Sequence, residues 1–253
     1  MNKYNYRVIK KVGGTIKNTK LISILTVIIL GFICMSVINV NKVVTTYKNA
    51  ESEQEKNKII LIDPGHGGID GGASSKDGTT EKDINLNIGL LLGANLKSQG
   101  YKVEFTRTED IGLYTEGKSV KEKKYEDLNK RVSLKEETKC DIFVSIHLNT
   151  FPESYCKGAQ VWYSNYEGSE RLANIMQGTL KDKLDQSNKR KAKAAGTQYK
   201  VLRGNDTMAG VIVECGFLSN PEEYQKLKDE EYQKKIADAL AESISIYLKE
   251  GAN

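Results

Sequence analysis

The chain has 253 residues but only two histidines, and each lies at the end of a run of strand-forming residues. His66 stands in "LIDPGHGG" (61–68), and His147 stands in "DIFVSIHLNT" (141–150). Neutral imidazole is the commonest protein ligand for metals, and it also acts as an acid or a base. Two imidazoles at equivalent ends of two strands therefore predict a shared chemical task, namely a metal site.

Carboxylates near His66 supply the remaining ligand that such a site needs. Zinc in a hydrolytic site takes three protein ligands from His and Asp or Glu and keeps one position open. Glu81 has an advantage because "GTTEKD" places it in the first turn of a helix, where the helix dipole keeps a carboxylate ionised. Thr80 is then the expected N-cap, with Asp83 at the capping-box position. The spacing leaves four candidates open, which are Asp63, Asp70, Glu81 and Asp83.

The elements that must position these residues alternate along the chain. Strands rich in β-branched residues are expected at 58–63, 101–107, 141–147, 158–164, 198–204 and 209–217, with polar loops at 108–124 and 187–196. Helices are expected at 81–100, 125–139 and 169–186, and in a C-terminal segment whose apolar residues recur every four positions at Tyr232, Ile236, Leu240, Ile244 and Leu248. This order predicts an α/β fold, a single domain with a central twisted, mostly parallel sheet flanked by helices.

In an open α/β sheet, sites form outside the carboxyl ends of the strands. His66 follows the first strand, His147 ends the third, and Glu214 lies near the end of the last. The topology therefore brings two imidazoles and a further carboxylate to one edge of the sheet. From this pattern alone, Glu214 is either a catalytic group or a buried structural acid.

Four motifs in this order resemble the zinc-dependent N-acetylmuramoyl-L-alanine amidases of the type 3 family. They are "DPGHGG", the glutamate fifteen residues after its histidine, "SIHLN" and "VIVECGFLSNPEE", and the match covers about 58–250. The resemblance implies zinc on His66, Glu81 and His147, with Glu214 as the catalytic base. It also implies hydrolysis of the amide bond between the lactyl group of N-acetylmuramic acid and L-alanine, which releases stem peptides from peptidoglycan.

Two further residues are candidates for substrate binding. "DLNKRV" matches a Leu-x-x-Arg segment of the same family at Leu128 and Arg131, although a solvated or paired arginine is the ordinary alternative on a helix. Asn149 lies two residues after His147, which places it on the same face if the strand continues. Asn149 is therefore expected either to touch the substrate or to support the ligands.

The first forty residues have a different composition from the rest. Six lysines and arginines precede "LISILTVIILGFICMSVINV" (21–40), twenty residues without a charge, which is the length of a helix that crosses a bilayer. A cleaved signal peptide is the alternative, but its apolar region runs only about 7–15 residues and ends at a small-x-small site. We predict a cytoplasmic basic tail at 1–20, a transmembrane signal anchor at 21–40, a linker at 41–57 and an extracytoplasmic zinc amidase domain at 58–253.

Charge and cysteine content exclude other classes of protein. The net charge is +5, but segment 1–40 holds six cations and no acids, so the remaining chain carries −1. Binding to nucleic acid is therefore not expected, since it needs a basic surface. The three cysteines after the anchor, Cys140, Cys156 and Cys215, are odd in number and form no CxxC pair, so they are expected to be free.

The expected biological role follows from the resemblance. A short anchored catalytic unit without wall-binding repeats is similar to the sporulation- and germination-specific subgroup, which acts in the forespore envelope and strips peptides from spore cortex as a step toward muramic-δ-lactam. Targeting would then depend on the membrane anchor or on an accessory protein that the sequence does not identify. The alternatives are a vegetative cell-separation amidase, a wall endopeptidase and an inactive peptidoglycan-binding protein.

Overall fold

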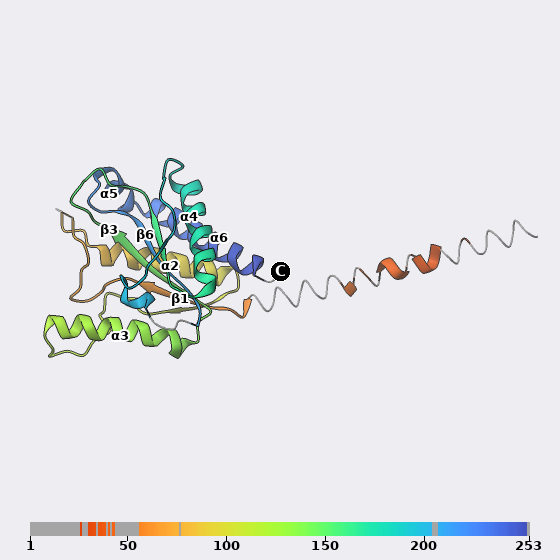
Figure 1. Cartoon of the computed structure of the whole chain (residues 1–253), viewed down its shortest axis with the longest axis horizontal. Coiled ribbons are helices and arrows are strands. Elements are labelled where there is room, and N and C mark those ends of the chain that lie inside the picture. The colour runs from red at the N-terminus through yellow and green to blue at the C-terminus, as the bar shows by residue number, and fades with distance from the viewer. Residues whose placement is uncertain are drawn as a thin grey trace, which may run out of the picture. The chain divides into compact units, whose positions relative to one another are not determined.

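The computed structural model of the chain describes residues 26, 30–33, 35–38, 40, 42–43, 56–75, 77–203 and 207–251 (Figure 1). The chain divides into two compact units, Met1–Glu53 and Gln54–Asn253. The second unit contains the sheet and every candidate site residue.

In the first unit, the described residues are helical. No helix among the described residues is long and apolar enough to cross a membrane. Half of the predicted transmembrane segment 21–40 lies outside the described residues, as do the whole predicted tail 1–20 and most of the linker 41–57. These three assignments therefore stay predictions.

In the second unit, the described residues form one six-stranded sheet with strand order β2-β1-β3-β6-β4-β5. The strands are β1 (Ile59–Pro64), β2 (Lys102–Phe105), β3 (Ile142–Asn149), β4 (Gln160–Tyr163), β5 (Lys193–Ala194) and β6 (Ala209–Phe217). Every neighbouring pair is parallel except β4 and β6, which are antiparallel. The predicted α/β class with a mostly parallel central sheet is confirmed.

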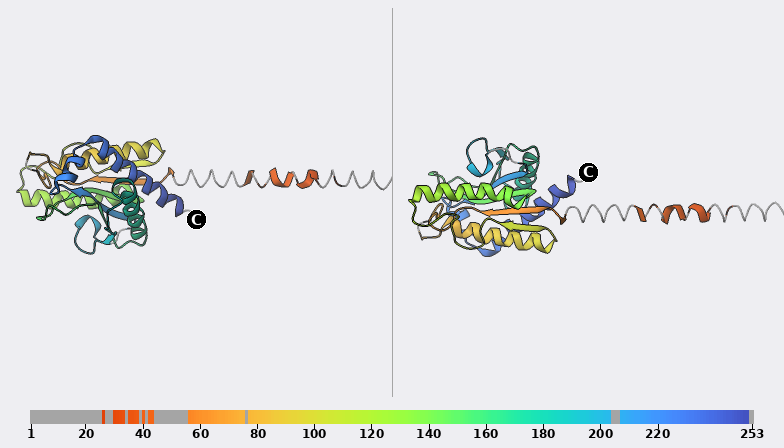
Figure 2. Two further views of the ribbon diagram at one scale, coloured as in Figure 1. Left: turned by 90° about the horizontal axis from the view of Figure 1, so that it is seen from above. Right: turned by 90° about the horizontal axis from the view of Figure 1, so that it is seen from below.

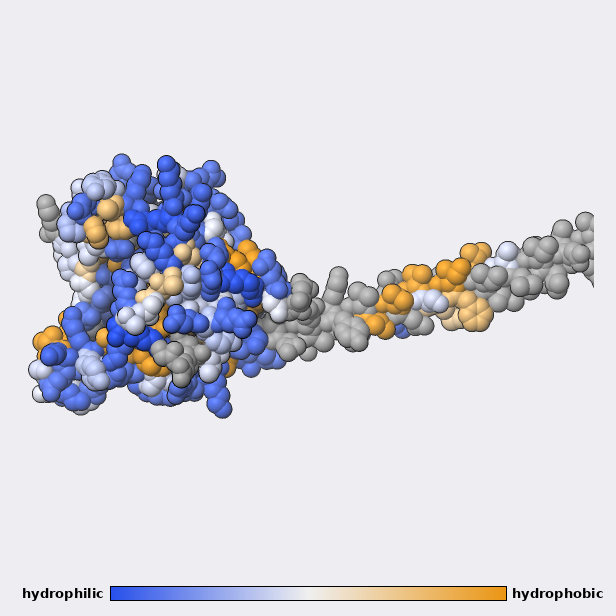
Figure 3. All heavy atoms as spheres, in the orientation of Figure 1, coloured by the Kyte–Doolittle hydropathy of each residue, from blue (hydrophilic) through white to orange (hydrophobic). Residues whose placement is uncertain are grey.

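Helices cover both faces of this sheet. They are α2 (Glu81–Ser98), α3 (Val120–Thr138), α4 (Glu167–Leu184), α5 (Pro221–Leu227) and α6 (Glu230–Glu250), with a short 3₁₀ helix η1 (Lys200–Leu202). One core packs α2, α4 and α6 against the sheet, and a smaller core packs α3 and η1 against the other face. The two views of Figure 2 place α2 and α3 on opposite sides of β1. Hydrophilic side chains cover most of the face of this unit that Figure 3 presents.

Several elements differ from the sequence-based predictions. The strand predicted at 198–204 is wrong, because η1 occupies this segment and buries the adjacent residues Val201 and Leu202 together. Both side chains pack in the same core, on the α3 side of the sheet, whereas a strand would point them to opposite faces. The short strand β5 lies in the segment predicted as a basic loop, and α5 was not predicted.

Helix α3 is longer than predicted at its N-terminus. It begins at Val120 rather than at residue 125, because Ser119 and Glu122 form a capping box. The C-terminal helix follows its predicted apolar stripe, and Ile236, Leu240 and Ile244 are fully buried. Amphipathic spacing was therefore a reliable guide where a helix packs directly on the sheet.

A glycine allows α2 to approach the strand that leads into the site. Gly89 is buried, and a Cβ atom built on it would lie 2.8 Å from Cγ of Pro64 at the end of β1. Such a contact is too short for two carbon atoms, so any side chain here must displace the helix or the strand.

We predict that Gly89→Ala lowers the free energy of unfolding by about 1–3 kcal/mol, the usual effect of overpacking a tight interior. The matched control is Gly178→Ala in α4, where a Cβ would have no described atom within 4 Å. The control is expected to raise stability by about 0.4–1 kcal/mol, because alanine restricts the unfolded chain. Urea denaturation measures both, and equal stability of the two variants would contradict the packing described above.

Candidate metal centre

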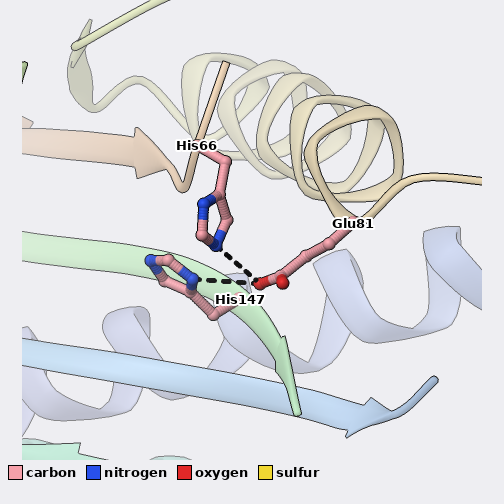
Figure 4. A group of neighbouring side chains, drawn as sticks. All are labelled: His66, Glu81 and His147. Atoms are coloured by element: carbon pink, nitrogen blue, oxygen red, sulfur yellow. Dashed lines mark hydrogen bonds and ion pairs between the residues drawn. The ribbon is translucent and has the colours of Figure 1, made fainter. Parts of the chain in front are cut away.

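Three side chains from separate parts of the chain meet at the carboxyl ends of β1 and β3 (Figure 4). His66 follows β1, Glu81 opens α2, and His147 lies on β3. Nε2 of His66 lies 3.2 Å, and Nδ1 of His147 lies 3.0 Å, from Oε1 of Glu81. One donor atom from each residue lies within 4.8 Å of the others. Of the four carboxylates that the spacing left open, Glu81 is the one that contacts both imidazoles.

The turn after β1 depends on glycines beside His66. His66 itself has a φ angle of 62°, a left-handed conformation that costs a residue with a side chain about 1–3 kcal/mol. A Cβ atom on Gly65 would lie 2.3 Å from the ring of His147. One on Gly72, whose φ is +67°, would lie 2.6 Å from Oε2 of Glu81. These glycines therefore leave the space in which the three side chains converge.

A second carboxylate orients His66. Nδ1 of His66 lies 2.9 Å from Oδ2 of Asp70, and Lys124 donates to the other oxygen of Asp70 at 2.8 Å. Burial lowers the pKa of His66, but the hydrogen bonds to Asp70 and Glu81 outweigh it and raise the pKa to about 9. A carboxylate on one ring nitrogen leaves the other nitrogen directed at the ligand position, as is usual for metal-binding histidines. Asp70 is thus a positioning residue for His66.

Backbone groups hold Glu81 in place. The residue is only 4% exposed, and it accepts from Ala73 N on Oε2 and from Leu148 N on Oε1, each at 2.9 Å. Burial raises the pKa of Glu81, but hydrogen bonds from His147 and His66 outweigh it and hold the pKa well below its usual range. The carboxylate is therefore ionised, as a metal ligand must be.

The predicted capping box at the start of α2 is only partly correct. Thr80 is the N-cap residue, but its side chain makes no hydrogen bond to the helix backbone. Its hydroxyl donates instead to the side chain of Asp83, so Asp83 is not part of the candidate metal centre.

Strand alternation places the polar groups on one face of the sheet. Ile60, Val144 and Val213 point toward α2, α4 and α6, whereas Leu61 and Ile212 point toward α3 and η1. Because side chains alternate along a strand, Asp63, His147 and Glu214 also point toward the side of α3 and η1, at the carboxyl ends of their strands. Cys215 accordingly packs in the first core, and all three cysteines in the described part of the chain are free, as predicted.

Glu214 lies beside His147, since the two residues are in register across β3 and β6. It is 7% exposed, and Oε2 has no hydrogen-bond partner among the described residues. Burial raises the pKa of Glu214, and the nearby His147 offsets this in part. A buried carboxylate with a free oxygen and a raised pKa is suited to accept and return a proton.

Tyr199 was not selected from the sequence. Its hydroxyl donates to Oε1 of Glu214 at 3.4 Å, and its ring packs on Trp162 with 5.6 Å between the centroids. Since the segment was predicted as a strand, no sequence signal placed this hydroxyl at the site.

Arg131 is buried against the turn that carries His66. The residue is 2% exposed, and it donates to the carboxylate of Asp63 and to the backbone oxygens of Pro64 at 3.0 Å and His66 at 2.6 Å. Its Nε donates to Asp127 at 2.6 Å. This geometry favours a positioning role for Arg131 over the substrate contact that the sequence analysis predicts.

Asn149 occupies the last position of β3 and is half-buried. A register shift separates it from His147, and its backbone oxygen accepts from Leu218 N at 2.9 Å. Its predicted contact with the substrate stays a prediction.

Comparison with known proteins shows the family of the chain. The model of a family described as N-acetylmuramoyl-L-alanine amidase matches residues 60–245. A germination-specific N-acetylmuramoyl-L-alanine amidase of Bacillus subtilis is 39% identical over 76% of this chain and 81% of its own length. A probable cell wall amidase of Staphylococcus aureus, LytH, is 31% identical over 79% of this chain and 62% of its own.

The chain is also similar to amidases whose structures have been solved. The CwlD amidase from Clostridioides difficile, solved in complex with the GerS lipoprotein, is 43% identical and covers 76% of this chain and 99% of its own, with a TM-score of 0.73. An N-acetylmuramoyl-L-alanine amidase from Clostridium difficile 630 is 32% identical over 77% of this chain and 98% of its own, with a TM-score of 0.66. The chain belongs to the N-acetylmuramoyl-L-alanine amidase family. It is therefore a peptidoglycan hydrolase that cleaves the amide bond between the lactyl group of N-acetylmuramic acid and L-alanine.

Replacing Arg131 by Met is expected to lower the free energy of unfolding by about 3–5 kcal/mol, because Asp63 would remain as an unpaired buried charge. Urea denaturation followed by circular dichroism measures the loss. The double variant Asp63→Asn/Arg131→Met removes that charge and should recover part of the stability.

The matched control for this prediction lies one residue away on the same helix. Lys130 pairs with Glu137 at 2.8 Å on the surface, so Lys130→Met should cost less than about 1 kcal/mol. Similar losses for Lys130→Met and Arg131→Met would show that the buried pair does not stabilise the turn.

Proposed function

We propose that His66, Glu81 and His147 hold a zinc ion and that Glu214 is the catalytic base of this amidase. The observation that carries the proposal is the approach of two imidazole nitrogens to one carboxylate oxygen, next to a buried carboxylate oxygen without a partner among the described residues. Two histidines and one carboxylate are a ligand set of catalytic zinc. Tetrahedral ligands at zinc bond lengths lie about 3.3 Å apart. The observed separations of 3.0 and 3.2 Å fit that requirement.

Each residue then has a definite part in the hydrolysis. Zinc supplies Lewis acidity to the water and the carbonyl group that react. Oε2 of Glu214 takes the proton of the attacking water and passes it to the nitrogen of L-alanine as the amide bond breaks. Tyr199 orients the other oxygen of Glu214, while Asp70 and Arg131 keep the His66 ring and its turn in place. Asn149 remains our candidate for a direct substrate contact.

The setting that we propose is the spore cortex. Its support is the similarity to the germination-specific amidase of Bacillus subtilis, which exceeds the similarity to LytH. Removal of the peptide frees the lactyl carboxyl group, which is a step toward muramic-δ-lactam. A vegetative cell-wall role is the alternative, and the match to LytH supports it less strongly.

We further propose that residues 21–40 anchor the protein in a membrane, with the catalytic unit outside. The support is the uncharged run of twenty residues behind six cations. An accessory protein belongs to the proposal as well, because the related CwlD amidase was solved with the GerS lipoprotein.

Two variants distinguish the loss of zinc binding from the loss of the catalytic base. Glu214→Gln is expected to abolish peptide release from purified peptidoglycan, because an amide cannot take the proton, while about one zinc per chain is retained. His147→Ala is expected to lose the zinc and the activity together. Elemental analysis by mass spectrometry and an assay of released peptides measure the two effects.

The surface variant Glu137→Gln serves as the control and should match the parent in both assays. Cleavage at the parent rate by Glu214→Gln would refute the base assignment. Full zinc content in His147→Ala would refute the ligand assignment.

The cellular role is tested by mass spectrometry of muropeptides from a deletion strain. Spores without the enzyme are expected to lack muramic-δ-lactam and to retain peptide-substituted muramic acid. Normal δ-lactam in the spores, together with chained vegetative cells, would instead establish the cell-separation role.

A further inference from the structure

A cavity of about 470 Å³ adjoins the candidate metal centre on the side of α3. Its walls come from the His66 turn, from α3 and from the segment around η1. The volume lies in the range of sites that enclose a small ligand, about 300–1,000 Å³. Because the cavity opens directly onto His66 and His147, a group bound there would lie next to the scissile bond.

The acidic groups of this cavity already have cationic partners. Arg131 pairs with both Asp63 and Asp127, and Lys124 pairs with Asp70 at 2.8 Å. Two cations thus face three carboxylates on that part of the lining, which leaves one negative charge. The sign of the cavity's net charge therefore depends on its remaining cations.

Lys200 lines the same cavity without such a partner among the described residues. Its Nζ atom is buried and has no hydrogen-bond partner among the described residues. It lies 3.8 Å from the centroid of the Tyr125 ring, which is itself 65% exposed. A ring face stabilises an ammonium group less completely than the hydrogen bonds it has lost. Arg203 is exposed and lines the same wall, where it adds a second positive charge.

We infer that this cavity binds the stem peptide on the leaving-group side of the scissile amide, and that Lys200 binds a carboxylate of that peptide. The inference rests on the proposed function. In a muramoyl peptide the lactyl carboxyl group is consumed in the amide, so the free carboxylates lie on the peptide. The flexible stem of lysine lets the ammonium group move from the Tyr125 ring to an anion in the cavity.

The test compares two soluble substrates with the full-length, zinc-loaded protein. One is N-acetylmuramoyl-L-alanyl-D-glutamate with a free α-carboxylate, and the other carries an amide at that position. The parent is expected to favour the acid in kcat/KM by about ten- to a hundredfold, the range of a hydrogen bond between charged groups. Lys200→Met should remove this preference and leave the rate on the amide nearly unchanged, whereas Lys200→Arg should keep it.

The amide substrate also serves as the control for folding, since a misfolded variant would lose activity on both compounds. Lys102→Met, an exposed lysine on β2, should behave as the parent. A parent without preference for the acid, or a Lys200→Met variant that keeps the preference, would overturn the inference.

A binding measurement separates this inference from the proposed function. Calorimetry with Glu214→Gln and with Glu214→Gln/Lys200→Met reports affinity for the two compounds without turnover. Tighter binding of the acid that disappears in the double variant supports the subsite, and equal affinities refute it. Binding without any cleavage by the parent would refute the proposed function instead.

Discussion

The buried ion pair between Arg131 and Asp63 fixes the turn on which the whole site is built. Asp63 is the second-last residue of the apolar strand β1, where a buried charge is costly, and Arg131 reaches it from α3. The same guanidinium also donates hydrogen bonds to the backbone oxygens of Pro64 and His66. Its donors are therefore engaged by the turn. Through these contacts the position of α3 sets the position of the His66 ring, so the second face of the sheet controls the chemistry at its edge.

The metal centre needs space around its ligands, which glycines leave, and a stabilised carboxylate, which the start of a helix supplies. Gly65 leaves room for the ring of His147, and Gly72 leaves room for the carboxylate of Glu81. Glu81 opens α2, and the backbone N–H groups of Ala73 and Leu148 stabilise its charge. The site therefore combines a strained turn, a helix N-terminus and two parallel strands, none of which could hold the ligands alone.

Much of the fold and part of the candidate site could be predicted from the sequence. The predictions that were wrong or missing have physical causes. Strand β6 was located at its observed bounds, because a central buried strand reads as a continuous apolar run. The two histidines could be chosen by their scarcity, but spacing alone left Glu81 among four carboxylates. Tyr199 and Lys200 could not be placed, because their segment is a 3₁₀ helix whose role depends on α3, a distant part of the chain. Burial of Arg131 was equally hidden, since an arginine on a charged helix usually faces solvent.

The central claim is that His66, Glu81 and His147 coordinate one zinc ion. X-ray absorption at the zinc edge of the loaded, full-length protein tests it directly. We expect scattering from two imidazole rings and from oxygen at about 2.0–2.2 Å, with no sulfur ligand. A sulfur shell near about 2.3 Å, or a signal with fewer than two imidazoles, would contradict it.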